Sequence, residues 1–279
     1  MKITKLFFLL RPNRSIMVAM ITGAAAFASG SEVVRTLLIT LAGWCLAVGG
    51  FSLDFYADRS LDVRDPRASV RRNPLASGEV APAAGLAFSL TFIALGLITT
   101  AFIELRALIP GAIILAVITG LALHLFERPL ARACTLGLLQ ALYVFMGAST
   151  GSITPAVLLL AGVFFFAMFG GRGMIDIRDF PVDEQNPVQT LPKRFGVKAT
   201  ARMTAVCLHI AYGLSLGVYL TGELSPLYLY LVIPFITIGL VCAWWFALRP
   251  SPELARTLTM VFMMGEGTLI CLAVILGSL

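Results

Sequence analysis

The sequence has 279 residues, of which 58% are hydrophobic and 13% charged, and its mean hydropathy is +0.91. A soluble domain carries about 25% charged residues, so this composition excludes a soluble globular protein and predicts an all-α protein that crosses a membrane several times. The net charge of +6 is expected to serve membrane topology and contacts with anionic lipid, and no nucleic-acid partner is predicted.

Apolar runs long enough to cross a bilayer as helices recur along the whole chain. They predict nine transmembrane helices in a single integral-membrane domain, residues 1–279, at about 15–30, 34–53, 81–103, 107–126, 133–150, 154–173, 200–221, 226–247 and 254–278. The runs are apolar on all sides, as expected for helices in lipid, and do not show the alternation typical of barrel strands.

The basic residues predict the orientation of these helices. If the N-terminus is cytoplasmic, all of the 21 Lys and Arg residues except Arg35 and Arg106 lie on the cytoplasmic side, which agrees with the positive-inside rule. The sequence therefore predicts a protein of the cell membrane with a cytoplasmic N-terminus and an external C-terminus.

Two connections are much longer than the others, at about residues 54–80 and 174–199, and both are predicted to be cytoplasmic. Each begins with regularly spaced aspartates, which form one stripe along a helix if the preceding helix continues through them. Like charges at this spacing repel one another, so a cationic partner is expected. The first aspartate stripe is Asp54, Asp58 and Asp62, and the second aspartate stripe is Asp176, Asp179 and Asp183.

The two stripes also repeat along the chain. Gly49 and Gly50 precede the first stripe as Gly170 and Gly171 precede the second, at an offset of about 122 residues. This repeat predicts two related halves of four helices each, followed by a ninth helix, with the two stripes face to face. Two pairs of small residues four positions apart predict close helix packing, namely Gly147 with Gly151 and Gly213 with Gly217.

The chemistry of the stripes favours a hard cation. Carboxylate clusters without His or Cys suit Mg²⁺, which typically takes one or two protein carboxylates together with water and phosphate oxygens. Basic residues follow or flank both stripes and are suited to bind a diphosphate. The sequence predicts that all six aspartates are Mg²⁺ ligands and that the diphosphate ligands are Arg71, Arg72, Arg172, Lys193 and Arg194.

Several motifs resemble those of the UbiA superfamily of intramembrane prenyltransferases. The sequence gives "DFYADRSLD" where that family has N-x-x-x-D-x-x-x-D, and "DIRDFPVD" where it has D-x-x-D-x-x-x-D. "NPLASGEV" from Asn73 and "TLPKRFG" from Thr190 match the segments that follow these motifs, and "RPN" from Arg11 matches the start of the first helix. The resemblance covers nearly the whole chain and implies a nine-helix, UbiA-like fold.

The resemblance also implies a reaction. It implies Mg²⁺-dependent transfer of a prenyl group from a polyprenyl diphosphate to a lipophilic, commonly aromatic, acceptor by ionisation of the allylic C–O bond. Asp58, Asp62 and the second stripe would be the catalytic residues that hold Mg²⁺ on the diphosphate, and the prenyl tail would lie between helices open to lipid. The residues expected near the acceptor or the prenyl chain are Asn13, Gln140, Tyr143 and Glu266.

Three positions depart from the family pattern and leave the metal geometry and the acceptor open. Asp54 stands where the family usually has Asn, Phe55 where many members have Asp, and Asn73 where an Arg usually precedes Pro74. His124 is expected to be a helix-packing or interface residue.

Two other functions are compatible with parts of the pattern. A terpene cyclase of the same superfamily would ionise the same substrate without an acceptor. A cation transporter would also bind Mg²⁺, but it predicts ionisable residues in the middle of several helices, and the sequence places few there.

Overall fold

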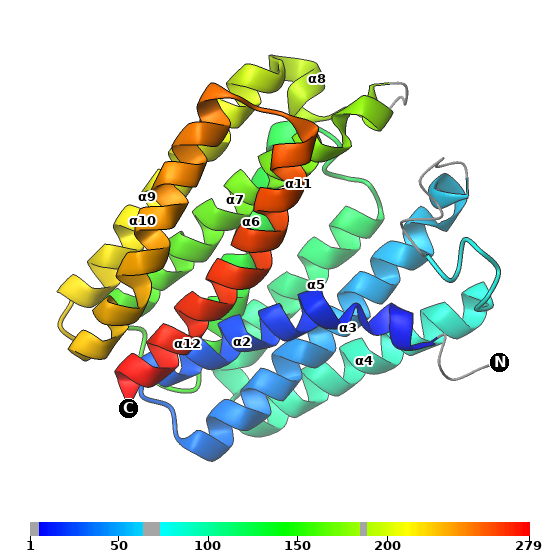
Figure 1. Ribbon diagram of the computed structural model, residues 1–279. Helices are drawn as coiled ribbons and strands as arrows, with labels where there is room; N and C mark the ends of the chain where they lie inside the picture. Colours follow the sequence, from blue (N-terminus) through cyan, green and yellow to red (C-terminus); the bar gives the residue numbers. More distant parts are fainter. Residues whose placement is uncertain (1–5, 64–72, 185–188) are drawn as a thin grey trace.

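The structure, a computed structural model, describes residues 6–63, 73–184 and 189–279, and these residues form helices and connecting turns only. Figure 1 shows long helices in one bundle. The helices are η1 (Phe7–Leu10), α2 (Pro12–Ala28), α3 (Val33–Asp62), α4 (Pro82–Ile103), η2 (Leu105–Ala107), α5 (Leu108–Ala122), α6 (Pro129–Ala148), α7 (Pro155–Asp183), α8 (Leu191–Phe195), α9 (Val197–Leu220), α10 (Pro226–Leu248), α11 (Pro252–Met260), η3 (Val261–Glu266) and α12 (Gly267–Ser278).

Seven helical segments in the described part of the chain are long and apolar enough to cross a membrane, so the chain is an integral membrane protein. They are α3, α4, η2 with α5, α6, α7, α9 and α10. Two predicted spans fall outside this set. The first corresponds to α2, whose 17 residues lie at the lower limit of about 17 for a transmembrane helix. The last is divided into α11, the π-helical η3 and α12, and the count of nine stays a prediction.

The helices that carry the aspartates extend further than hydropathy predicts. α3 has 30 residues and includes Asp62, and α7 has 29 and ends at Asp183. The predicted loop boundaries at residues 54 and 174 are therefore wrong, because the chain becomes polar about two turns before its helix ends. At about 1.5 Å per residue such a helix is roughly 45 Å long and exceeds a hydrocarbon core of about 30 Å. Both helices end on the same side of the bundle (Figure 1).

Glycines below each stripe bring a neighbouring helix into close contact. A Cβ at Gly49 would lie 2.9 Å from the backbone oxygen of Ser89 on α4, and a Cβ at Gly170 would lie 3.1 Å from that of Thr204 on α9. The Ser89 hydroxyl donates to the Gly49 carbonyl at 2.6 Å, and the Thr204 hydroxyl donates to the Gly170 carbonyl at 3.2 Å. The two stripe-bearing helices are thus held to their neighbours in the same way, and the division of the chain into two related halves stays a prediction.

A second close contact joins α2 to α6. A Cβ at Gly147 would collide with the carbonyl oxygen of Thr22, and one at Gly151 would collide with that of Ser29, so this predicted glycine pair does pack closely. The second predicted pair, Gly213 with Gly217, does not pack as closely, because a Cβ at Gly213 would meet nothing within 4 Å.

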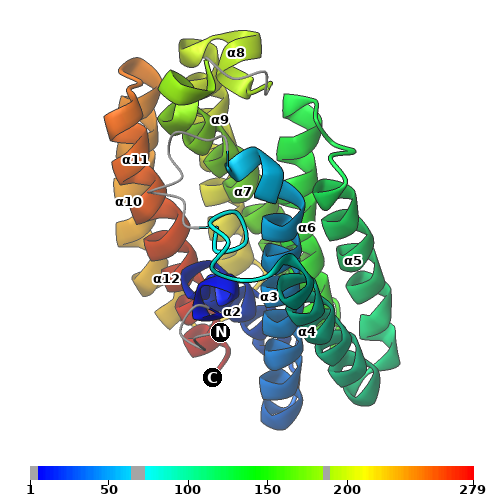
Figure 2. The same cartoon turned by 90° about the vertical axis from the view of Figure 1, so that its right-hand side faces the viewer.

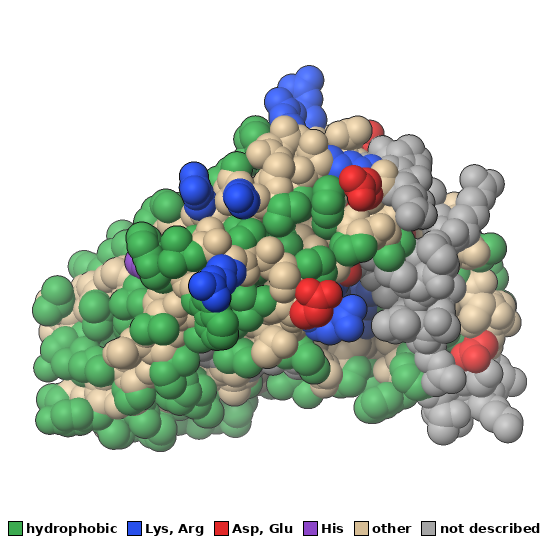
Figure 3. All heavy atoms as spheres, turned by 45° about the horizontal axis from the view of Figure 1, so that its top comes forward, with side chains coloured by type: hydrophobic (Ala, Val, Ile, Leu, Met, Phe, Trp, Pro, Cys, Tyr) green, Lys and Arg blue, Asp and Glu red, His purple; other side chains and the backbone are tan. Residues whose placement is uncertain are grey.

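The helices differ in how much of their apolar surface is buried inside the protein. α4 and α10 bury only 22% and 28% of their apolar windows inside the protein, against 61% for α3, so α4 and α10 face lipid and α3 is central. Figure 3 shows charged side chains gathered on the face around the stripe-bearing end, whereas the flank that runs away from it is mainly hydrophobic.

Candidate active site

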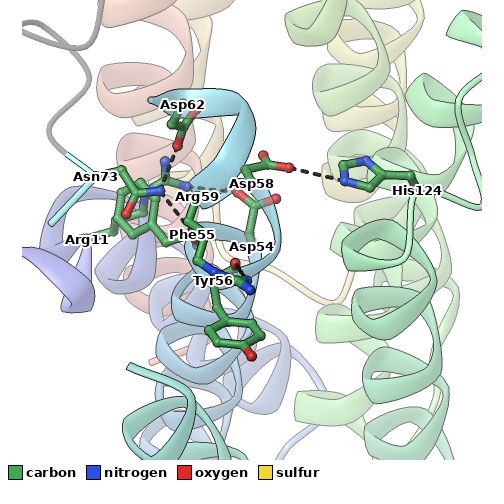
Figure 4. Close-up of polar contacts among 9 residues, drawn as sticks. All are labelled: Arg11, Asp54, Phe55, Tyr56, Asp58, Arg59, Asp62, Asn73 and His124. Atoms are coloured by element: carbon green, nitrogen blue, oxygen red, sulfur yellow. Dashed lines mark hydrogen bonds and ion pairs between the residues drawn. The ribbon is translucent and has the colours of Figure 1, made fainter. Parts of the chain in front are cut away.

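Asp54, the first member of the first aspartate stripe, is paired with the start of α2. Arg11 Nη1 donates to Asp54 Oδ2 at 3.3 Å. The Arg11 guanidinium carbon lies 3.8 Å from the centre of the Phe55 ring, a cation–π contact (Figure 4). Arg11 therefore neutralises the stripe at its first carboxylate and anchors the N-terminal segment to α3.

Asp62, the last member of this stripe, is held by an amide. Asn73 is buried, and its Nδ2 donates to Asp62 Oδ2 at 2.7 Å and to the Phe55 carbonyl at 2.9 Å. The Asn73 side-chain oxygen accepts from the Leu75 backbone N–H at 3.0 Å. Asn73 thus fixes the chain that returns from the long connection against the end of α3.

Asp58, between them, faces a histidine from the turn that follows α5. His124 Nε2 lies 3.5 Å from Asp58 Oδ1, and Figure 4 shows the two side chains pointing toward each other. The contact with Asp58 is compatible with the packing or interface role expected for His124, and it adds a partner that the sequence did not reveal. Spacing alone does not show such a contact, because His124 follows the end of α5, which is far from α3 in sequence.

Arg11 and His124 share an unusual backbone conformation. Among the described residues they are the two non-glycine residues with positive φ, at 43° and 56° respectively. Left-handed backbone costs a non-glycine residue about 1–2 kcal/mol, and such strain concentrates at functional sites. In this protein both strained residues contact aspartates of the first stripe.

Asp176, the first member of the second aspartate stripe, is almost fully buried. Its side chain is 2% exposed and pairs with Arg172, one turn earlier on α7, at 2.6 Å between Oδ1 and Nη2. The backbone N–H of Leu191, at the start of α8, donates to its other oxygen at 3.1 Å. A buried carboxylate requires this compensation, and the contact also fixes α8 beside the stripe.

Asp179 has its own arginine. Arg178 Nε and Nη2 donate to the two oxygens of Asp179 at 2.9 and 2.8 Å, the two-point geometry that arginine also uses for phosphate. Asp183 lies half-buried in the last turn of α7, and Lys193 and Arg194 lie on α8. Arg178 was not among the predicted diphosphate ligands, although its position between two stripe residues was a usable signal.

The two stripes lie at the same end of the bundle but do not form one cluster. In the described part of the chain, no three acidic, histidine or cysteine side chains come close enough to hold a metal ion together. α3 and α7 make little direct contact, and α6 packs against both. Arg132 on α6 lies within electrostatic reach of Asp58 and of Arg172. A metal site shared by the two stripes stays a prediction.

The remaining predicted residues are scattered. Asn13 is exposed in the first turn of α2. Tyr143 is buried on α6, and one turn before it Gln140 has a buried side-chain oxygen without a hydrogen-bond donor. Arg71 and Arg72 lie outside the described residues, and so does the side chain of Glu266.

Comparison with known sequences identifies the family. The sequence model of the UbiA prenyltransferase family matches residues 16–265. The chain belongs to the UbiA prenyltransferase family. Relatives named digeranylgeranylglyceryl phosphate synthase include one from Methanoregula boonei, 26% identical over 77% of this chain and 76% of that protein, and one from Methanothermobacter thermautotrophicus, 25% identical over 79% and 77%.

Solved structures share the UbiA-like fold. A structure of digeranylgeranylglyceryl phosphate synthase aligns with a TM-score of 0.77 and 21% identity over 99% of both chains. A UbiA homolog from Archaeoglobus fulgidus bound to DMAPP and Mg²⁺ aligns with a TM-score of 0.72 and 19% identity over 96% of this chain and 97% of that one.

The contacts of Arg11 and Asn73 give physical roles to the three departures from the UbiA pattern. Asp54 stands where the family usually has Asn and Phe55 where many members have Asp, and both contact the Arg11 guanidinium. Asn73, which replaces an Arg, is uncharged and hydrogen-bonds both to Asp62 and to the backbone of Leu75. The changes therefore form a linked set around the end of α3.

Proposed function

We propose that this UbiA-family protein transfers a prenyl group from a polyprenyl diphosphate to a lipophilic acceptor, with Mg²⁺ as cofactor. The observation that carries the proposal is the pair of aspartate stripes at one end of the bundle, each accompanied by arginines, in a chain that matches the family over residues 16–265. A polyprenyl diphosphate matches this arrangement, because its anionic head suits the charged end of the bundle and its apolar tail suits the membrane-spanning helices.

The side chains around the stripes fit Mg²⁺ by their chemistry. The donor atoms are carboxylate oxygens, which suit this ion. Because the family usually has Asn at the position of Asp54, we assign the cofactor to Asp58, Asp62, Asp176, Asp179 and Asp183. Of these, Asp176 and Asp179 also pair with arginines. When bound, Mg²⁺ supplies positive charge to the diphosphate oxygens. The structural relatives solved with Mg²⁺ and prenyl diphosphates support this assignment.

The basic side chains would bind and orient the diphosphate. Arg172 and Arg178 lie against the second stripe at 2.6 and 2.8 Å from their carboxylates, and Lys193 and Arg194 lie on the neighbouring α8. As the allylic C–O bond ionises, negative charge grows on the leaving diphosphate, and fixed cations stabilise it. Arg71 and Arg72 are proposed to complete this clamp.

For the acceptor we propose the hydroxyl group of a glyceryl phosphate lipid. The relatives named digeranylgeranylglyceryl phosphate synthase support this choice over the aromatic ring that the motif resemblance implied. The aromatic acceptor is the second candidate, and Gln140 and Tyr143 are proposed to contact whichever acceptor binds, because the Gln140 oxygen lacks a donor.

The active site is proposed to face the cytoplasm in the cell membrane. The basic residues favour an internal N-terminus and an external C-terminus, with α2 and the α11–α12 segment as the eighth and ninth spans. Consistent with this, α2 begins near the end of α3 and the C-terminus lies at the opposite end of the bundle (Figure 1).

The test uses purified protein in lipid nanodiscs with Mg²⁺ and geranylgeranyl diphosphate. Three reactions are compared by mass spectrometry: no acceptor, geranylgeranylglyceryl phosphate, and a phenolic acid. An ether product formed only with the glyceryl phosphate supports the proposal. Product with the phenol alone selects the aromatic acceptor, a cyclic hydrocarbon without acceptor identifies a cyclase, and no product in any reaction contradicts prenyl transfer.

A further inference from the structure

A groove lies between α5 and α6 at the end of the bundle opposite the aspartate stripes. Its volume of about 620 Å³ falls within the range of about 300–1,000 Å³ typical of ligand sites. Figure 2 shows α5 and α6 side by side along one flank. Apolar side chains form its walls, and polar residues form its rim, the lining being Arg106, Ile109, Pro110, Ile113, Leu142, Phe145, Ser149, Gly151, Ser152 and Ile153.

The rim of this groove carries one charged residue, Arg106. Arg35, the other base at this end, lies 3.9 Å from a Glu32 oxygen and 4.0 Å from a Glu104 oxygen. Arg106 is exposed, and among the described residues no carboxylate pairs with its guanidinium; Glu104 accepts only its backbone N–H. The groove therefore combines a free cation at the rim with an apolar wall that runs along the membrane.

We propose that this groove binds an anionic phospholipid of the surrounding membrane. The phosphate would lie at Arg106, with the Ser152 hydroxyl beside it, and an acyl chain would lie along Ile109, Ile113 and Phe145. Ile109 and Ile113 are 68% and 43% exposed, and Leu142 at 7% forms the deeper wall, so the groove is a recess open to lipid.

This site is separate from the prenyl-transfer site. α6 has 20 residues, which at about 1.5 Å per residue places its two ends roughly 30 Å apart. Arg132 lies near the stripe end of α6, and Ser149 follows its other end. A lipid in the groove would pack on α6, whose other neighbours include α2, α3 and α7, and would stabilise the helix that lies between the two stripes.

Native mass spectrometry of delipidated protein tests the proposal, with phosphatidylglycerol and phosphatidylcholine as probes at equal concentration. One arginine near an anionic lipid head is worth about 1 kcal/mol, so the wild type should retain phosphatidylglycerol about fivefold more than phosphatidylcholine. Arg106→Gln should reduce this preference about fivefold. Arg35→Gln, the matched control, should keep it. Equal retention of both lipids by the wild type, or an unchanged preference in Arg106→Gln, would overturn the proposal.

A second variant tests the apolar wall. Ile113→Trp fills the groove from an exposed position and should reduce the retention of both lipids, and also reduce the rise in melting temperature that phosphatidylglycerol produces in wild type. If Ile113→Trp retains both lipids as wild type does, the groove is not the site. If the wild type instead forms a dimer that Ile113→Trp dissociates, the occupant is a second copy of the chain and the lipid proposal is wrong.

Discussion

At the scale of single residues, the two aspartate stripes are compensated by different means. The second stripe has arginines on its own helix, because Arg172 and Arg178 pair with Asp176 and Asp179. The first stripe takes its contacts from elsewhere in the chain, from Arg11, Asn73 and His124. Asp58 and Asp179 are the central carboxylates of the two stripes. Asp58 is contacted by a residue distant in sequence, whereas Asp179 is contacted by the adjacent Arg178.

Loss of either central carboxylate should abolish turnover. Asp58→Ala and Asp179→Ala each remove a proposed Mg²⁺ ligand, and removal of one such electrostatic contact typically costs about 10²–10³ in kcat. Steady-state kinetics in nanodiscs measures this loss, and gel filtration checks that both variants insert and fold. Wild-type rates in either variant would remove that aspartate from the site.

Asp54→Asn should be tolerated. It restores the usual family residue, and the Arg11–Asp54 pair that it weakens is partly exposed, with Asp54 41% exposed, so its contribution is about 0–1 kcal/mol. We expect kcat/KM within about threefold of wild type on this ground. Complete loss of turnover would instead give the sixth aspartate an essential task.

His124 should show opposite effects on stability and activity. His124→Gly relieves the left-handed backbone at φ 56° and should stabilise the protein by up to about 1 kcal/mol, measured by thermal unfolding. It also removes the side chain that faces Asp58, and loss of a residue that orients a metal ligand typically costs about 10–100-fold in activity or metal affinity. His124→Ala, which keeps the strain, should lose activity without gaining stability. Full activity in both variants would assign His124 a structural role only.

At the scale of helices, glycine contacts set the distances between neighbours. Gly147→Ala should destabilise the protein by about 1–3 kcal/mol, a typical cost of overpacking, because its Cβ would meet the Thr22 carbonyl on α2. Gly213→Ala is the matched control, since its Cβ would meet nothing within 4 Å, and it should gain up to about 1 kcal/mol of helix propensity. Melting temperatures in detergent compare the two, and equal temperatures would contradict the close contact between α2 and α6.

The helices and the stripes could largely be predicted from the sequence, because hydropathy and a fixed spacing of aspartates are local signals. The helix ends could not, because the polar turns of α3 and α7 resemble loops by hydropathy alone. The partners of the first stripe could not either, since the contacts of Asp58 with His124 and of Asp54 with Arg11 join residues 66 and 43 positions apart. Such contacts depend on how α2, α3 and α5 pack together.

At the scale of the whole molecule, the distribution of charge predicts how the bundle sits in the membrane. A reporter fused after Leu279 should be active outside the cytoplasm, and a cysteine introduced at the exposed position Glu184 should react with an impermeant reagent only after the cells are opened, because basic residues remain on the cytoplasmic side. Labelling of this cysteine in intact cells would reverse the proposed orientation.

The hydrogen bonds that the Ser89 and Thr204 hydroxyls donate to the Gly49 and Gly170 carbonyls bear on how a bulky substrate enters. They join α3 to α4 and α7 to α9 about one and a half turns below the carboxylates, where the absence of a glycine side chain leaves the backbones in contact. Separating the two helices of a pair would break these backbone contacts. We therefore expect an incoming isoprenoid to enter between the α3–α4 pair and the α7–α9 pair, with the helices of each pair staying together.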